Sequence, residues 1–134
     1  MKKILFALLY VLLGTGVFSQ PLSVNIKGVE TVTGNILVAL YNSSETFLEK
    51  PFMTKKIEVT SDSLLFKFEG VSEGNYALSL FQDVNNNNKL DLGNMGIPTE
   101  KYGFSNNPFL FGKPDFETCM FKFDKDSTIV IELK

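Results

Sequence analysis

The sequence predicts an all-β protein: a single antiparallel β-sandwich of about seven strands, with one long loop rich in Asn and Gly. The first observation is that apolar and polar residues alternate with a period of two in most of the chain, which is the pattern of half-buried strands. The second is that these runs are rich in Val, Ile, Phe and Tyr, which favour strands. The third is that clusters of Gly, Asn, Ser and Asp separate the runs at the spacing of a sandwich.

Residues 1–19 predict a secretory signal peptide. A positively charged start precedes an apolar run over residues 4–13, and small residues follow before a predicted cleavage site at Gln20. The run is shorter than the ~20 apolar residues of a membrane-spanning helix, so we expect no membrane span after cleavage. The chain is therefore expected to be exported across the inner membrane to the periplasm or the cell exterior, with residues 20–134 forming a single domain.

The expected strands share the alternating pattern, and in chain order they cover residues 22–27, 36–41, 56–60, 64–68, 76–81, 116–123 and 128–133. Residues 36–41 are apolar on both faces, as expected of a central strand. Ahead of the fifth strand, Gly74 is expected to permit a tight turn. Tyr76 is expected to bury its ring and to bond its hydroxyl to nearby backbone.

The segment 43–51 is expected to form one helical turn over an open edge of the sandwich. One of the two serines at its start would cap the turn, and Pro51 would end it. Phe47 and Leu48 supply the apolar side chains that would cover the edge.

The composition excludes several kinds of function. The chain has no His and one Cys, which argues against zinc binding and against a nucleophile–base pair. Cys119 lies in an expected apolar strand, where a buried free thiol is the common outcome. The net charge is −2 and every basic residue is Lys, which argues against nucleic acid as a partner. We therefore expect a protein that is not an enzyme.

The start of the long loop resembles a calcium-binding loop in its spacing. The candidate ligands supply oxygen at alternate positions, from side chains or, for the lysine, from the backbone carbonyl: Asp83, Asn85, Asn87, Lys89 and Asp91. Calcium takes six to eight such oxygens in irregular geometry. Asn88 stands where an EF-hand loop has Gly, and Asn94 stands where it has Glu. With two carboxylates, affinity would be weak, about 10⁻⁴ to 10⁻³ M. The alternative is an Asn-rich turn whose side chains bond their own backbone.

The loop and its flanks also carry motifs of a known family. These are Tyr76 followed by Gln82-Asp83-x-Asn85-x-Asn87-x-x-Leu90-Asp91, then Gly96-Ile97-Pro98-x-Glu100, then Tyr102-Gly103-Phe104-Ser105-Asn106-Asn107. In these motifs the chain resembles the secreted bacterial family called domain of unknown function 2141. The resemblance implies export and a small transthyretin-like (prealbumin-like) β-sandwich, and it implies no reaction.

The second half of the loop supplies further candidate binding residues: Glu100, Tyr102, Phe104 and Asn106. Glu100 would complete a cation site or form a salt bridge within the loop. The aromatic residues between 102 and 116 allow two interpretations. They fold back as a lid on the core, or they form an exposed platform for a protein or carbohydrate ligand.

Three functional hypotheses follow. The first is an exported binding or structural module with a calcium-stabilised loop at residues 83–107. The second is a structural envelope domain without metal. The third is a glycoside hydrolase that uses two carboxylates among Asp83, Asp91 and Glu100.

Overall fold

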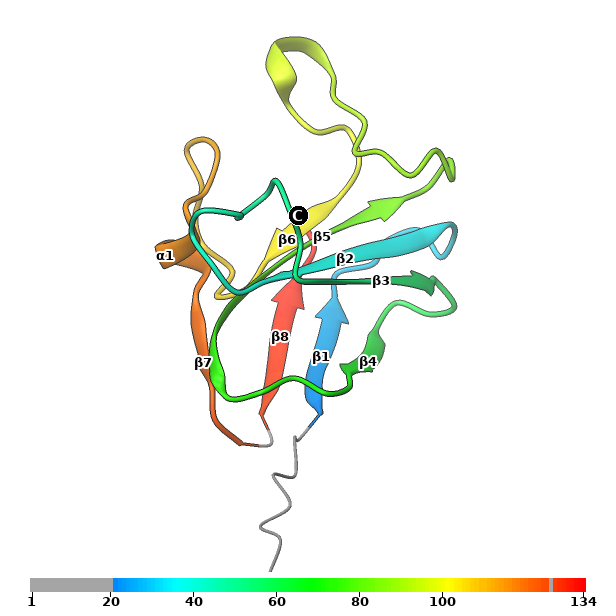
Figure 1. The fold of residues 1–134 in the computed structure, drawn as a ribbon. Helices are drawn as coiled ribbons and strands as arrows, with labels where there is room; N and C mark the ends of the chain where they lie inside the picture. Colours follow the sequence, from blue (N-terminus) through cyan, green and yellow to red (C-terminus); the bar gives the residue numbers. More distant parts are fainter. Residues whose placement is uncertain (1–20, 126) are drawn as a thin grey trace, which may run out of the picture.

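The computed structural model describes residues 21–125 and 127–134, so the predicted signal peptide lies outside the described residues. The described chain folds into two packed β-sheets, and the prediction of an all-β sandwich is confirmed (Figure 1). It contains eight strands, against about seven expected. In this part of the chain, no helix has both the length and the apolar character needed to cross a membrane.

The smaller sheet joins the two ends of the described chain. Its order is β4 (Leu64–Phe68), β1 (Leu22–Lys27) and β8 (Thr128–Glu132). Strand β1 runs antiparallel to β4 and parallel to β8. The expected antiparallel arrangement therefore holds for every described strand pair except β1 and β8, the first and last strands of the described chain.

The larger sheet is built around the long strand β5 (Gly74–Asp83). The order is β3 (Met53–Glu58), β2 (Asn35–Tyr41), β5 and β6 (Tyr102–Phe104). Strand β7 (Phe121–Phe123) pairs with the first residues of β5, whereas β6 pairs with residues further along it. The strands of the two sheets run in clearly different directions, so the sheets cross as they pack (Figure 1).

The core lies between the sheets and follows from the alternation in the sequence. Strand β1 contributes Leu22, Val24 and Ile26, all without solvent exposure. The matching buried residues of the larger sheet include Ile36, Val38, Leu40, Leu78 and Leu80. Apolar burial of this kind stabilises by about 25 cal/mol for each Å² removed from water.

The expected strand at residues 116–123 is wrong in its first half. Residues Phe116–Cys119 form the short helix α1, and the strand begins only at Phe121. The Asp115 carboxylate accepts a bond from the backbone N–H of Thr118 at 2.8 Å, which caps the helix. Phe116 and Cys119 are both buried, because residues three apart lie on one side of a helix, whereas an alternating strand would place them on opposite faces.

A second apolar cluster covers one end of the outer face of the larger sheet. It consists of Tyr41, Phe47, Ala77, Phe116 and Cys119. The segment 43–51 forms turns here and no assigned helix, although Lys50 N–H bonds the Thr46 carbonyl at 2.9 Å in a helical i to i+4 pattern. Phe47 is buried and Leu48 is partly buried in this cluster, so the two side chains cover the outer face of the sheet at this end and not the edge that the sequence predicts.

The turn before β5 differs from the expectation in one residue. Gly70, with φ of 72°, has the left-handed conformation, and Gly74 does not. The prediction for Tyr76 is confirmed, because its ring is buried and its hydroxyl donates to the Ser72 carbonyl at 2.7 Å.

Candidate functional site

The long loop leaves β5 at Asp83, whose carboxylate organises the first turn. Asp83 is fully buried. Its two oxygens accept bonds from the backbone N–H groups of Asn87, at 3.2 Å, and Asn88, at 2.8 Å. A carboxylate can accept several hydrogen bonds, so each oxygen keeps a further lone pair.

The candidate ligands Asn85, Asn87 and Asp91 come together in the same turn. The amide nitrogen of Asn85 lies 2.5 Å from Asp91 Oδ2, and that of Asn87 lies 2.6 Å from Asp91 Oδ1. The amide oxygens accept bonds from the backbone N–H groups of Asn87 and Lys89, at 3.3 and 3.0 Å, as in Asx-turns. The structure thus brings the four predicted side-chain ligands into one hydrogen-bonded turn. Lys89 takes part through its backbone N–H, whereas the prediction used its carbonyl.

Two residues of this turn have left-handed backbone conformations. Asn86 has φ of 56° and Asn88 has φ of 60°. Asn88 occupies the position of the usual Gly, and Asn tolerates this region better than most residues. The turn is therefore made without the glycine.

Glu100 joins the two ends of the turn. Its carboxylate accepts bonds from the backbone N–H groups of Val84 and Asp91, each at 3.1 Å. Two neighbouring strands also hold the turn: Asn35 donates to Asn86 at 2.6 Å, and Lys56 Nζ donates to Asn88 at 3.0 Å. Glu100 therefore holds the backbone of the turn. In the described part of the chain it forms no salt bridge.

The turn has the donor chemistry of a hard-cation site. Its oxygens come from two carboxylates, Asp83 and Asp91, and from two amides. In the described residues, no group of three or more His, Cys, Asp or Glu side chains is placed to hold a metal ion. A cation here would therefore depend on amide and backbone oxygens as well as on the carboxylates.

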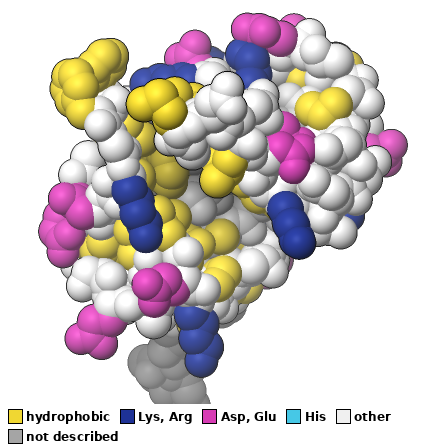
Figure 2. All heavy atoms as spheres, turned by 90° about the horizontal axis from the view of Figure 1, so that it is seen from above, with side chains coloured by type: hydrophobic (Ala, Val, Ile, Leu, Met, Phe, Trp, Pro, Cys, Tyr) yellow, Lys and Arg dark blue, Asp and Glu magenta, His cyan; other side chains and the backbone are white. Residues whose placement is uncertain are grey.

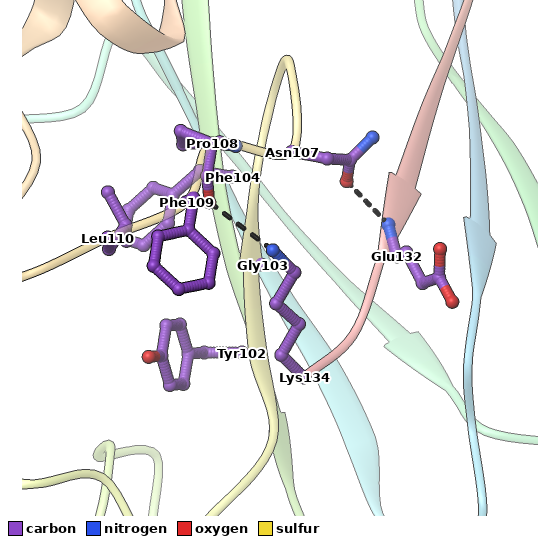
Figure 3. Close-up of a pocket in the computed structure, with 9 residues that line it drawn as sticks. All are labelled: Tyr102, Gly103, Phe104, Asn107, Pro108, Phe109, Leu110, Glu132 and Lys134. Atoms are coloured by element: carbon purple, nitrogen blue, oxygen red, sulfur yellow. Dashed lines mark hydrogen bonds between the residues drawn. The ribbon is translucent and has the colours of Figure 1, made fainter.

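The remaining predicted binding residues lie on or beside β6. Tyr102 and Phe104 are half-buried and line a pocket of about 120 Å³ with Phe109 and Lys134. Figure 3 shows the Tyr102 and Phe109 rings on the same side of Lys134, whose Nζ donates to the Pro108 carbonyl at 3.3 Å. Tyr102 and Phe104 therefore present aromatic surface at this edge.

Asn106 serves the fold and lies away from the Asp83 turn. Its amide donates to the carbonyls of Thr118 and Met120, at 3.2 and 2.8 Å, beside the end of α1. Its neighbour Asn107 accepts from Glu132 N–H and donates to the Val130 carbonyl, which pins this segment to β8 (Figure 3).

Some aromatic residues after β6 fold back on the protein as a lid, and others are exposed as a platform would be. Phe116 is buried in the second cluster, as a lid residue would be. Phe109 and Phe111 are 80% and 97% exposed and pack edge to face, with ring centroids 5.0 Å apart. These two rings are exposed, as the platform interpretation expected.

Two buried polar residues that sequence reasoning did not single out hold the loop to the sandwich. Gln82 donates to the carbonyls of Thr31 and Thr33, both at 2.8 Å. Ser105 accepts from Leu78 N–H at 2.9 Å and donates to the Cys119 carbonyl. Both residues belong to the motifs that resemble the family, and this was the only feature of the sequence that pointed to them.

Comparisons with known proteins agree with this picture of the motifs. The chain matches the family described as an uncharacterised protein conserved in bacteria, domain of unknown function 2141, over residues 24–131. Neither the curated proteins nor the solved structures contain a significant match. Because the match covers most of the chain, the protein belongs to the domain of unknown function 2141 family.

Proposed function

We propose that the chain is an exported, non-enzymatic binding module in which calcium stabilises the loop at residues 83–107. The observation that carries this proposal is the convergence of Asn85 and Asn87 on both oxygens of Asp91, next to the Asp83 carboxylate. The surface around Tyr102 and Phe104 would then bind a protein or carbohydrate ligand.

The amide groups make the turn adaptable to a cation. A half-turn of each amide exchanges its nitrogen and oxygen, two atoms of nearly equal size. The oxygens of Asn85 and Asn87 would then face Asp91, and calcium would remove the repulsion among them and offset the loss of the bonds that these oxygens accept from the Asn87 and Lys89 N–H groups. Asp83 keeps free lone pairs, and Lys89 adds a backbone carbonyl in the predicted pattern.

A second candidate function is a structural envelope domain without metal. One observation favours it: the turn is already fully hydrogen-bonded, with Asp83, Asn85 and Asn87 each accepting from backbone N–H groups. In the described part of the chain, no buried polar side-chain atom lacks a partner. In this function the turn would be a rigid connector and would not respond to calcium.

The glycoside hydrolase hypothesis gains no support from the geometry. Asp83 is buried under its own turn, and both oxygens of Glu100 accept backbone N–H groups. A general acid and a nucleophile must face a substrate from opposite sides of a scissile bond. These carboxylates face the backbone instead, so we do not propose this activity.

The test is a thermal melt of the purified protein with calcium and with chelator. At ten times its dissociation constant, a ligand stabilises the folded state by about 1.4 kcal/mol. For a domain of this size that corresponds to a rise in Tm of about 4–6 °C. The rise should vanish in the double variant Asp83→Asn plus Asp91→Asn and in Asp91→Asn alone.

The matched control is Asp62→Asn, which removes an exposed carboxylate from a different turn. It should keep the calcium-dependent rise in Tm. An unchanged Tm of the wild type at every calcium concentration would refute the metal site and leave the structural domain as the function.

A further inference from the structure

A large groove lies on the outer face of the larger sheet. Its volume is about 1290 Å³, above the roughly 300–1,000 Å³ of common small-molecule sites. Cross-strand pairs form its floor. One row contains Leu37 of β2, Phe81 of β5 and Tyr102 of β6, and the next contains Ala39, Ser79 and Phe104.

Two loop segments form the walls of this groove. One is residues 90–98, from the loop that the proposed calcium site would stabilise, and the other is residues 110–114. Both carry apolar side chains that are open to solvent: Met95 is 96% exposed, Ile97 62% and Phe111 97%. Figure 2 shows hydrophobic side chains gathered in a hollow on this face, with charged side chains around it.

The apolar floor distinguishes this face from an ordinary sandwich surface. An antiparallel sheet with one solvated face normally alternates between apolar and polar residues. Here the second apolar cluster covers the Tyr41 end of the outer face, and the groove is the part that it leaves open. Contiguous exposed apolar surface of this kind marks ligand sites.

The charges that line the groove are all positive. The ammonium groups on this face belong to Lys56 and Lys113, and no carboxylate lines the groove, although the chain is acidic overall. Lys56 continues the floor row beside Leu37. Lys56 Nζ donates to Asn88. Lys55 lines the groove without its charge, because its Nζ donates to the Lys67 carbonyl of β4 and lies over the Phe66 ring on the side of the other sheet. Within residues 21–125 and 127–134, Lys113 makes no hydrogen bond or ion pair.

We propose that the groove binds a single-chain carboxylic acid amphiphile, a long-chain fatty acid. The alkyl chain would lie on the floor of Leu37, Phe81 and Phe104, and the carboxylate would be attracted to Lys56 and Lys113. The few polar side chains of the floor, such as Ser79, suit this ligand better than a sugar, which needs many hydrogen bonds. This inference rests on the proposed binding role, because the loop supplies one wall.

The test is fluorescence titration with dansyl-labelled undecanoic acid, followed by displacement with unlabelled fatty acids below their micellar concentrations. Saturable binding is expected, with affinity rising about two- to fourfold for each added methylene. Palmitate should displace the probe at lower concentration than its methyl ester, because the ester has no charge for the lysines. Equal displacement by acid and ester would overturn the charge assignment and so the proposal.

Matched variants locate the binding. Ile97→Asp places a carboxylate in the wall and should weaken binding at least tenfold. Leu65→Asp changes a side chain of similar exposure, 67%, on the other sheet and should leave binding unchanged. Lys113→Glu should weaken binding about three- to tenfold, and the exposed Lys122→Glu should not. Equal effects of Ile97→Asp and Leu65→Asp would place binding elsewhere and overturn the proposal.

The calcium melt keeps this inference separate from the proposed function. Saturable fatty acid binding without a calcium response supports the groove and refutes the metal site. A calcium response without fatty acid binding does the reverse. A wild-type protein that forms dimers, loses them in Ile97→Asp and binds no fatty acid would assign the groove to a second copy of the chain, which overturns the proposal.

Discussion

Cys119 is a thiol whose surroundings suppress its ionisation. Burial raises the pKa of Cys119 to about 11, and the negative charge of Asp115 adds to the effect. An ordinary Cys titrates near pH 8.5, so the unfolded chain loses this proton at lower pH than the folded chain does. The stability that the neutral thiol contributes is complete below about pH 8.5 and is lost as the pH rises towards 11.

The expected result is a free energy of unfolding that falls more steeply with pH in the wild type than in Cys119→Ala. Denaturant titrations between about pH 8 and pH 10.5 measure this slope. Both proteins contain the same tyrosines, so their titration cancels in the comparison. Parallel slopes would show that the thiol ionises equally well in both states.

At the same scale, the spacing of the Asn-rich turn predicted much of the candidate site. Asp83, Asn85 and Asn87 bond backbone N–H groups a few residues ahead, which is a local property that the sequence contains. The role of Glu100 depends on β6 returning beside β5, so its bonds to Val84 and Asp91 could not be read from spacing.

Among the elements, the start of β5 depends on one buried hydroxyl. The Tyr76 hydroxyl donates to the Ser72 carbonyl across the turn that follows β4. Tyr76→Phe keeps the ring and removes this bond, so we expect a loss of about 0.5–1.5 kcal/mol in the free energy of unfolding. Chemical denaturation of both proteins measures the difference.

The control for this prediction is Tyr102→Phe, because Tyr102 lies at the groove and its hydroxyl makes no hydrogen bond within the described residues. It should change the stability by less than about 0.5 kcal/mol. A loss in Tyr76→Phe no larger than that of the control would mean that the turn holds its shape through Gly70 and the backbone alone.

The elements that alternation predicted correctly are those with one face in the core. Strands β1, β2, β4 and β8 appear within one residue of the expected positions. The short strand β6 was missed because it lies inside a polar loop and is defined by its pairing with β5. Helix α1 was read as strand because a single turn of helix is too short to show a 3.6-residue period.

Viewed as a whole molecule, the two sheets are closed along one edge. The backbone groups of Tyr102 and Lys134 bond each other, with Tyr102 N–H to Lys134 O at 3.3 Å and the reverse bond at 3.0 Å. Gly103 lies at this closure. A Cβ there would lie 2.7 Å from Ile131 Cγ2 and 3.1 Å from the Glu132 carbonyl oxygen.

Gly103→Ala should therefore lower the free energy of unfolding by about 1–3 kcal/mol, because the sheets must separate to admit the methyl group. The matched control is Gly112→Ala, where no atom lies within 4 Å of the new Cβ. Denaturant melts of both variants measure the difference. Equal stabilities would show that β6 and β8 adjust freely at this edge.

The groove is a property of the whole molecule, which explains why the sequence did not reveal it. The pattern of residues 36–41 showed that both faces of β2 are apolar, and a fully covered central strand was the natural interpretation. Only the assembled fold shows that the second cluster stops short and leaves Leu37 and Ala39 beside open space.

The pairing of β1 with β8 has a consequence for the kinetics of folding. These strands are the first and last of the described chain, so the smaller sheet cannot form until nearly every residue is available. The entropy of closing so long a loop is lost before the contacts form, and folding on the scale of milliseconds to seconds is typical of such topologies. In a chain that is still emerging from a ribosome or a channel, the smaller sheet therefore stays incomplete until β8 arrives.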